Sequence, residues 1–179
     1  MLDKVWFTYK ARIQAHHRLE WMDKHSQFLL VWYAILGAAL AVVAIRYPTL
    51  LGKNTDIFGA ILSIALLGVS LSIANRDFRG RALNMLKNYL ALQHLYNVIY
   101  TRNAVQPEDI VKYDELMSDV ENHRDMDDKT FRVRNASQLT SRHPGKTEYF
   151  QVYFFIVFKY VVLFIFYIIP VIVAWYLYE

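Results

Sequence analysis

The sequence predicts an all-α integral membrane protein: a two-span helical hairpin, a third C-terminal span and a helical cytoplasmic extension. Three observations predict this fold class. Hydrophobic residues make up 55% of the 179 residues. Three stretches of 18 or 19 residues carry no charged side chain, close to the roughly 20 apolar residues that a helix needs to cross a bilayer. The region between the second and third stretch keeps a helical spacing of its apolar residues.

The chain has the length of one compact membrane domain, which we divide into four regions. We expect a cytoplasmic amphipathic helix (residues 1–26), a membrane hairpin (27–74), a cytoplasmic helical region (75–149) and a C-terminal membrane span (150–179). The sequence contains no cysteine. This excludes disulfides, thiolate metal sites and a cysteine nucleophile.

The first two apolar stretches, residues 28–45 and 57–74, are joined by an 11-residue loop and predict a membrane hairpin. Basic residues indicate its orientation. Five precede the first stretch, 12 lie between residues 75 and 149, and only Arg46 and Lys53 lie in the loop. Since basic residues accumulate on the cytoplasmic side, we expect the N-terminus and the middle region in the cytoplasm.

Small residues form a stripe on each of these two spans. On the second span the stripe contains Gly59, Ser63 and Ser70, which allows a close approach to the first span. Gly68 and Ser72 lie on the opposite side. In a ring of subunits this second face would pack against neighbouring copies or line a narrow pore. Alternatively, serines in a span merely bond their own backbone.

The middle region is helical in pattern. Beyond Gly80 a broad apolar stripe runs to Ile99, so we expect the second span to continue inward as one long helix. Pro107 begins a new helix, with acidic residues in the first turn where the helix dipole favours them. The apolar stripe of that helix is Ile110, Tyr113, Met117 and Val120. Residues 125–146 are polar, including a solvated acidic cluster at 125–128, and predict a flexible connector.

The third apolar stretch lies between Lys159 and Glu179. These residues are 20 positions apart, about 30 Å of helix, which matches the hydrocarbon thickness and places both charges at the interfaces. In the alternative register residues 150–170 span, and Lys159 is buried near the middle of the bilayer at a cost of roughly 3 kcal/mol. Pro170 kinks the helix in either register.

No motif supports a catalytic residue, a cofactor site or a metal site, so we expect the chain not to be an enzyme. The sequence from His143 to Thr147 ends like a phosphate-binding loop, but it lacks the first glycine and the preceding strand. His17 and Glu20 share a helix face, with His16 beside them, but the spacing implies no further ligand. Solvated or interfacial histidines are the better interpretation.

Two segments resemble the SLATT family of membrane domains. Residues 6–34 are similar to the start of that domain, which has an aromatic residue, Tyr-Lys-x-Arg, a small residue, Arg-Leu and then a serine before the first span. The matching residues are Tyr9, Lys10, Arg12, Ala15, Arg18, Leu19 and Ser26. Residues 113–131 are similar to the family's Tyr-x-x-Leu helix and the motif that follows it. That motif is Glu121, Asn122 and His123. The resemblance covers most of residues 5–131, whereas the third apolar stretch departs from the family's two-span description.

The resemblance implies a bacterial antiphage effector, encoded beside a nucleotide-producing enzyme, a nucleotide-sensing domain or a reverse transcriptase. We interpret the chain as a homo-oligomeric pore or channel in the inner membrane that arrests growth on activation, with no direct binding to nucleic acid. The alternatives are a membrane anchor or scaffold for a partner defence enzyme and a small transporter. The absence of charge in the first two spans disfavours a transporter.

Overall fold

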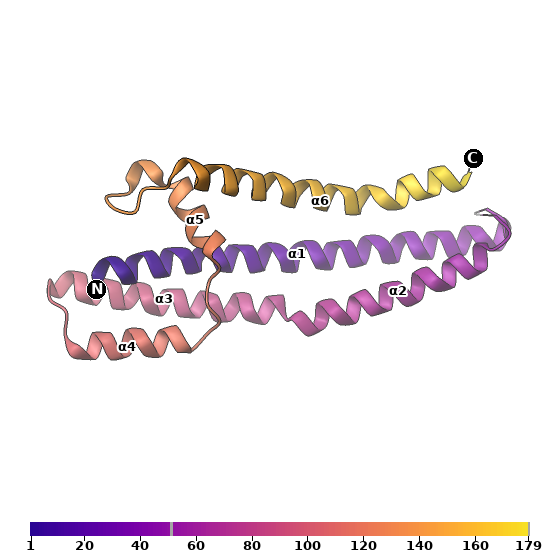
Figure 1. The fold of residues 1–179 in the computed structure, drawn as a ribbon. Helices are drawn as coiled ribbons and strands as arrows, with labels where there is room; N and C mark the ends of the chain where they lie inside the picture. Colours follow the sequence, from indigo (N-terminus) through magenta and orange to yellow (C-terminus); the bar gives the residue numbers. More distant parts are fainter. Residues whose placement is uncertain (51, 179) are drawn as a thin grey trace. The chain divides into compact units, whose positions relative to one another are not determined.

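The computed structural model describes residues 1–50 and 52–178, and every regular element in these ranges is helical (Figure 1). The elements are α1 (Leu2–Arg46), α2 (Thr55–Arg76), α3 (Phe78–Arg102), α4 (Pro107–Ser118), α5 (Asp125–Arg134), the short 3-10 helix η1 (Ala136–Gln138) and α6 (Lys146–Tyr178). This confirms the all-α fold class. Glu179, expected at the far interface, lies outside the described residues.

The chain forms two compact units, and each contains segments that are distant in sequence. The polar unit consists of Met1–Met22 and Phe78–Phe155, and the apolar unit of Asp23–Asp77 and Ile156–Glu179. Three helical stretches are long and apolar enough to cross a membrane: Leu2–Arg46, Thr55–Arg102 and Lys146–Val173. The protein is therefore a membrane protein, as its composition predicts.

The first half of α1 is the central element of the polar unit, because it contributes to each of three hydrophobic clusters. One cluster comprises Val5, Tyr9, Leu92, Leu95, Ile99, Tyr113 and Leu116, which join α1 to α3 and α4. A second comprises Ala15, Leu19, Phe78, Ala82 and Met85, and a third comprises Phe7, Phe131 and Leu139. Apolar side chains on several faces of one helix require neighbours all round, and α3, α4 and α5 supply them.

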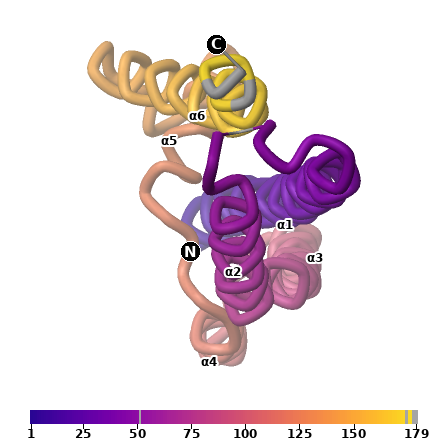
Figure 2. The backbone as a smooth tube through the Cα atoms, turned by 90° about the vertical axis from the view of Figure 1, so that its right-hand side faces the viewer, coloured from indigo at the N-terminus to yellow at the C-terminus, as the bar shows by residue number. Residues whose placement is uncertain are grey.

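The apolar unit is covered much less by its own chain. Its α2 runs beside the second half of α1, and the turn between them includes residues 47–50 and 52–54 (Figures 1 and 2). Gly52 occupies that turn with a φ of 91°, which a residue with a side chain rarely adopts. Within the described chain the only buried residue of α2 is Thr55. Lipid or other protein must therefore cover the apolar side chains of this span.

Two expected helix boundaries differ from the structure. The N-terminal segment is not a separate helix that ends at residue 26, since α1 continues without a break to Arg46. The second span does not continue as one helix, because Asp77 takes a left-handed conformation (φ 41°, ψ 51°) between α2 and α3. Aspartate is among the few residues that tolerate this conformation, so the chain turns there at low cost.

The region after α3 is more ordered than predicted. Pro107 does begin α4, but α4 ends at Ser118, so the motif at 121–123 lies in the following linker. The expected stripe is partly wrong, since Ile110 is 50% exposed and Leu116 is buried in its place.

The predicted connector also contains α5. The Asp127 carboxylate accepts a hydrogen bond from the Arg124 backbone N–H at 2.9 Å and thereby closes a capping box at the start of this helix. Three aspartates lie in its first turn, where their negative charges interact favourably with the positive end of the helix dipole.

Candidate functional site

Arg12 of the SLATT-like motif is completely buried and joins three helices. Its guanidinium donates to the Leu116 carbonyl at 2.9 Å, to the Met117 carbonyl at 3.4 Å and to the Asn88 side-chain oxygen. Asn88 in turn donates to the Leu116 carbonyl at 2.8 Å. A cation at the last carbonyls of a helix stabilises its negative end. Arg12 therefore closes the C-terminus of α4 against α1 and α3.

Arg18, the next arginine of the motif, binds α5. Its Nε and a terminal nitrogen donate to the two carboxylate oxygens of Asp127 at 2.9 and 3.1 Å. The side chains of this pair are only 11% and 4% exposed. Bidentate arginine–carboxylate pairs are among the stronger polar contacts in proteins. The prediction of a solvated acidic cluster at 125–128 is therefore wrong for Asp127, whose carboxylate is buried in an ion pair.

The other motif residues also have identifiable neighbours. Tyr9 lies in the core, where burial, followed by the nearby Tyr96, raises the pKa of its phenol. Lys10 lies over the rings of Tyr9 and Trp6, at 5.1 and 5.8 Å from their centres. Tyr9 and Lys10, at the start of the motif, therefore take part in the packing of the polar unit.

The second motif lies on the linker between α4 and α5. The Glu121 carboxylate accepts a hydrogen bond from the Arg81 guanidinium at 2.7 Å. His123 is half-buried; burial, and then the Arg12 charge, lower the pKa of its imidazole. Asn122 is exposed, and nothing in the structure explains its presence.

Arg132 connects α5 to the first turn of α6. Its guanidinium donates to both oxygens of Glu148, at 2.5 and 2.8 Å, and to Asp128 at 2.9 Å. Glu148 also accepts from the Gly145 backbone N–H at 3.0 Å. The hydrogen bond from Arg132 lowers the pKa of Glu148, because it favours the ionised form of the carboxylate. This pair sets where the C-terminal helix begins.

In the apolar unit, Tyr33 binds the C-terminal helix at the point where Pro170 weakens it. Pro170 has no backbone N–H, so the carbonyl four residues earlier, that of Phe166, loses its helical donor. The Tyr33 hydroxyl donates to this carbonyl at 2.8 Å. Unpaired backbone groups are costly in lipid. A side chain of α1 thus replaces the hydrogen bond that proline removes from α6.

We expect Tyr33→Phe to destabilise the protein in detergent by about 0.6 kcal/mol and at most about 1.7 kcal/mol, the average and the maximum for hydrogen bonds between spans. The same change should cost almost nothing in a Pro170→Ala background, because the introduced alanine has a backbone N–H that bonds the Phe166 carbonyl. Equilibrium unfolding of the four proteins of this cycle measures the difference. An equal cost in both backgrounds would show that the hydroxyl does not replace the missing donor.

The glycines of the spans have free space around them. A Cβ atom built on Gly37, Gly59 or Gly68 meets no atom within 4 Å. The facing small residues line a cavity of about 240 Å³. They are Gly37, Ala41 and Ala44 on α1, and Gly59, Ala60 and Ser63 on α2. Gly59 and Ser63 thus face small residues of α1 across this cavity, and among the described residues no backbone atom approaches Gly59 closely.

The sequence patterns do not predict the contacts of Tyr33, Asp127, Arg132 and Glu148. A signal existed for Tyr33, because a proline inside a span predicts an unpaired carbonyl four residues earlier that needs a donor. The ion pairs had no such signal. Arg18 and Asp127 are 109 positions apart, and charged side chains in a polar stretch are usually solvated.

The family comparison agrees with these features. A sequence profile of the SMODS and SLOG-associating 2TM effector domain family 5, a SLATT family, matches residues 1–177. The match includes α6, although the family description counts two transmembrane helices. Searches of curated proteins and of solved structures found no match. Because the profile spans almost the whole chain, both units included, the protein belongs to SLATT family 5, the SMODS and SLOG-associating 2TM effectors.

Proposed function

We propose that this effector assembles from several copies and forms a pore or channel in the bacterial inner membrane, which permeabilises the membrane and arrests growth of an infected cell. One observation carries the proposal: α2 has the length of a span, yet within the described chain it buries only Thr55. In this proposal a second copy of the chain covers the faces of α2 that α1 leaves exposed.

Lipid alone would cover the apolar side chains of α2, but the small residues favour protein as the neighbour. Helices in membranes associate through glycine, alanine and serine, which permit close backbone contact. Gly68 and Ser72 are exposed on the face that we assign to neighbouring copies or to the pore. Ser63, by contrast, donates to its own helix at the Gly59 carbonyl at 2.9 Å, so its hydroxyl is already satisfied. Ser70, half-buried, belongs to the same stripe as Ser63.

The interfacial register of α6 is part of this proposal. Lys159 lies close enough to His25 for their charges to interact, and His25 lies three residues before the first apolar stretch. Tyr33 follows His25 by eight residues and Phe166 follows Lys159 by seven, about 12 and 10 Å of helix respectively. The hydrogen bond between Tyr33 and Phe166 therefore supports a parallel arrangement of α1 and α6, in which Lys159 and His25 lie at the same depth in the membrane.

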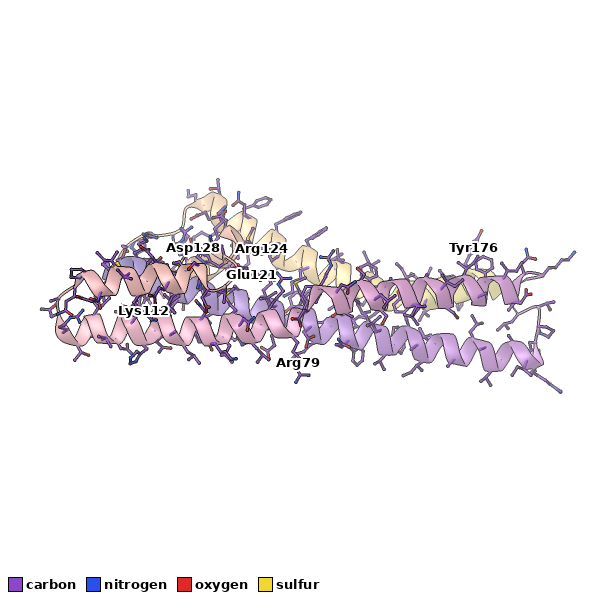
Figure 3. All side chains as sticks on the ribbon, turned by 90° about the horizontal axis from the view of Figure 1, so that it is seen from below. Arg79, Lys112, Glu121, Arg124, Asp128 and Tyr176 are labelled. Atoms are coloured by element: carbon purple, nitrogen blue, oxygen red, sulfur yellow. The ribbon has the colours of Figure 1, made fainter. Side chains whose placement is uncertain are left out.

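This depth supports an interfacial Lys159. A lysine near a helix end extends its ammonium group to the headgroups, whereas one at mid-bilayer costs several kcal/mol. At the other end of α6, Trp175 and Tyr176 are exposed, as residues of an aromatic belt would be. Figure 3 labels Tyr176.

A partner enzyme would supply the activating signal in this proposal. The family resemblance points to a nucleotide-producing enzyme or a reverse transcriptase as that partner. The compact polar unit supports a second candidate function, a membrane anchor or scaffold for such an enzyme, because one chain carries both this folded unit and the membrane-crossing helices.

Ion flux through the purified protein in liposomes tests the pore. We expect vesicles that contain an active form to release a trapped ion, with a protein-concentration dependence steeper than linear because several copies are needed. Protein-free vesicles and vesicles that contain heat-denatured protein are the controls. Absence of flux from every active form would reject the pore and favour the anchor.

Thiol labelling tests the proposed orientation, since the chain has no cysteine of its own. We expect a membrane-impermeant thiol reagent, applied to intact spheroplasts, to label Asn54→Cys. It should leave Ser118→Cys unlabelled until the spheroplasts are lysed. The reverse pattern would place the N-terminus and the polar unit outside the cytoplasm.

A further inference from the structure

We propose that His16, His17 and Glu20 form a binding site on α1 for a divalent transition metal of the zinc class. The structure brings one metal-binding atom of each side chain within 4.8 Å of the other two. This inference concerns the polar unit alone, and it does not depend on whether the protein forms a pore.

Helix geometry explains why the three side chains converge. Successive residues of an α-helix are about 100° apart, so Glu20 lies about 40° from His16 and about 60° from His17, between the two. The His17 Nδ1 atom lies 3.8 Å from a Glu20 carboxylate oxygen. The centres of the two imidazole rings are 5.3 Å apart. Both rings therefore lie beside the carboxylate, on one face of α1.

The structure also orients His16 in the way that metal-binding histidines are usually oriented. Its Nδ1 atom lies 3.0 Å from the Ala82 carbonyl oxygen of α3. A carbonyl only accepts hydrogen bonds, so Nδ1 carries the proton, and the lone pair of the neutral ring is on Nε2. A backbone carbonyl bound to the other ring nitrogen is the common second partner of a metal-ligating histidine. The Tyr89 ring, 5.8 Å away, flanks the imidazole.

The ligand types select the metal. Two imidazoles and one carboxylate are ligands for zinc, copper or nickel, whereas magnesium and calcium prefer sites made of oxygen atoms. Tetrahedral zinc with bonds of about 2.0 Å places its ligands about 3.3 Å apart, so side-chain rotation of the order of 1 Å completes the site. The side chains of His17 and Glu20 are 61% and 43% exposed. A metal ion therefore has access, and water or a further ligand takes the fourth position.

Metal binding at this place would strengthen the contact between α1 and α3. The hydrogen bond from His16 to Ala82 holds the ring in its binding orientation, so a bound metal and this hydrogen bond stabilise each other. A ligand that binds only the folded chain raises its unfolding temperature. Zinc is therefore expected to stabilise the polar unit.

The test uses the full-length protein in detergent after removal of metal with a chelator. We expect isothermal titration with zinc chloride to show one saturable site per chain and the thermal midpoint to rise, with no such response to magnesium. His17→Ala and Glu20→Gln should each weaken zinc binding at least about tenfold, which is 1.4 kcal/mol. Glu20→Gln keeps the size of the side chain and so serves as the variant that preserves the fold.

His94→Ala is the matched control, because His94 is an exposed histidine of the same unit outside the cluster. It should bind zinc like the wild type. Equal binding by the wild type and both cluster variants would overturn the site. An equal loss in His94→Ala would do the same, since the metal would then bind elsewhere.

Discussion

Asp127→Ala is expected to lower the free energy of unfolding of the protein in detergent by roughly 3–5 kcal/mol, the usual cost of removing one partner of a buried ion pair. The side chain of Arg18 is only 11% exposed, and without its carboxylate it would remain as an uncompensated buried charge. The same substitution removes the acceptor that caps α5 at the Arg124 N–H. Chemical denaturation followed by circular dichroism measures the loss.

Asp125→Ala provides the control for this experiment. Asp125 occupies the same first turn of α5 and pairs with Lys129, but its side chain is 77% exposed. Exposed pairs of this kind contribute about 0.3–0.5 kcal/mol. Similar losses for the two variants would mean that the effect of Asp127 comes from its position in the helix and not from the buried pair.

Gly68→Ile is expected to abolish growth arrest and to reduce ion flux at least about tenfold. A loss of about 1.4 kcal/mol in the free energy of contact between copies lowers the association constant by that factor. A Cβ atom built on Gly68 meets no atom of the described residues within 4 Å, so we expect the fold of one copy to tolerate a side chain there. In an assembly, a branched side chain would separate helices that meet through small residues. Growth curves, membrane-potential dyes and liposome flux measure the effect.

Gly37→Ile is the matched control on the first span. Gly37 also has free space around it, but it lines the cavity between α1 and α2. The new side chain would fill this cavity, which should leave stability unchanged or raised and activity intact. Full activity of Gly68→Ile at normal folded yield would exclude that face of α2 from both the pore and the contact between copies.

The membrane-crossing helices follow from local sequence, and this is why they could be predicted. An apolar stretch without charges has few stable alternatives to a spanning helix, whatever the rest of the chain does. The start of α4 was predictable for a similar reason, since proline and two acids suit the first turn of a helix. The resemblance to the SLATT motifs also singles out Arg12 and Arg18, both of which make buried contacts.

The roles of Arg12 and Arg18 and the formation of α5 depend on residues that are distant in sequence. Local sequence patterns do not reveal such contacts. Asp127 looks like a solvated residue in the sequence because its partner is on α1, 109 positions away. The break at Asp77 is equally hidden, since the apolar pattern continues on both sides of it and Asn75 and Gly80 nearby do not by themselves end a helix. A single left-handed residue there interrupts what the apolar pattern predicts as one helix.

The discontinuous polar unit has a consequence for the order of events during protein synthesis. The Thr8 hydroxyl meets the Tyr113 hydroxyl across 105 positions, so the first 22 residues cannot pack until the ribosome has made the middle of the chain. At about 5–20 residues per second this delay is roughly 5–20 s. Both hairpin spans emerge during that interval. We expect the hairpin to insert first, and an unfinished chain would therefore reach the membrane without a folded polar unit.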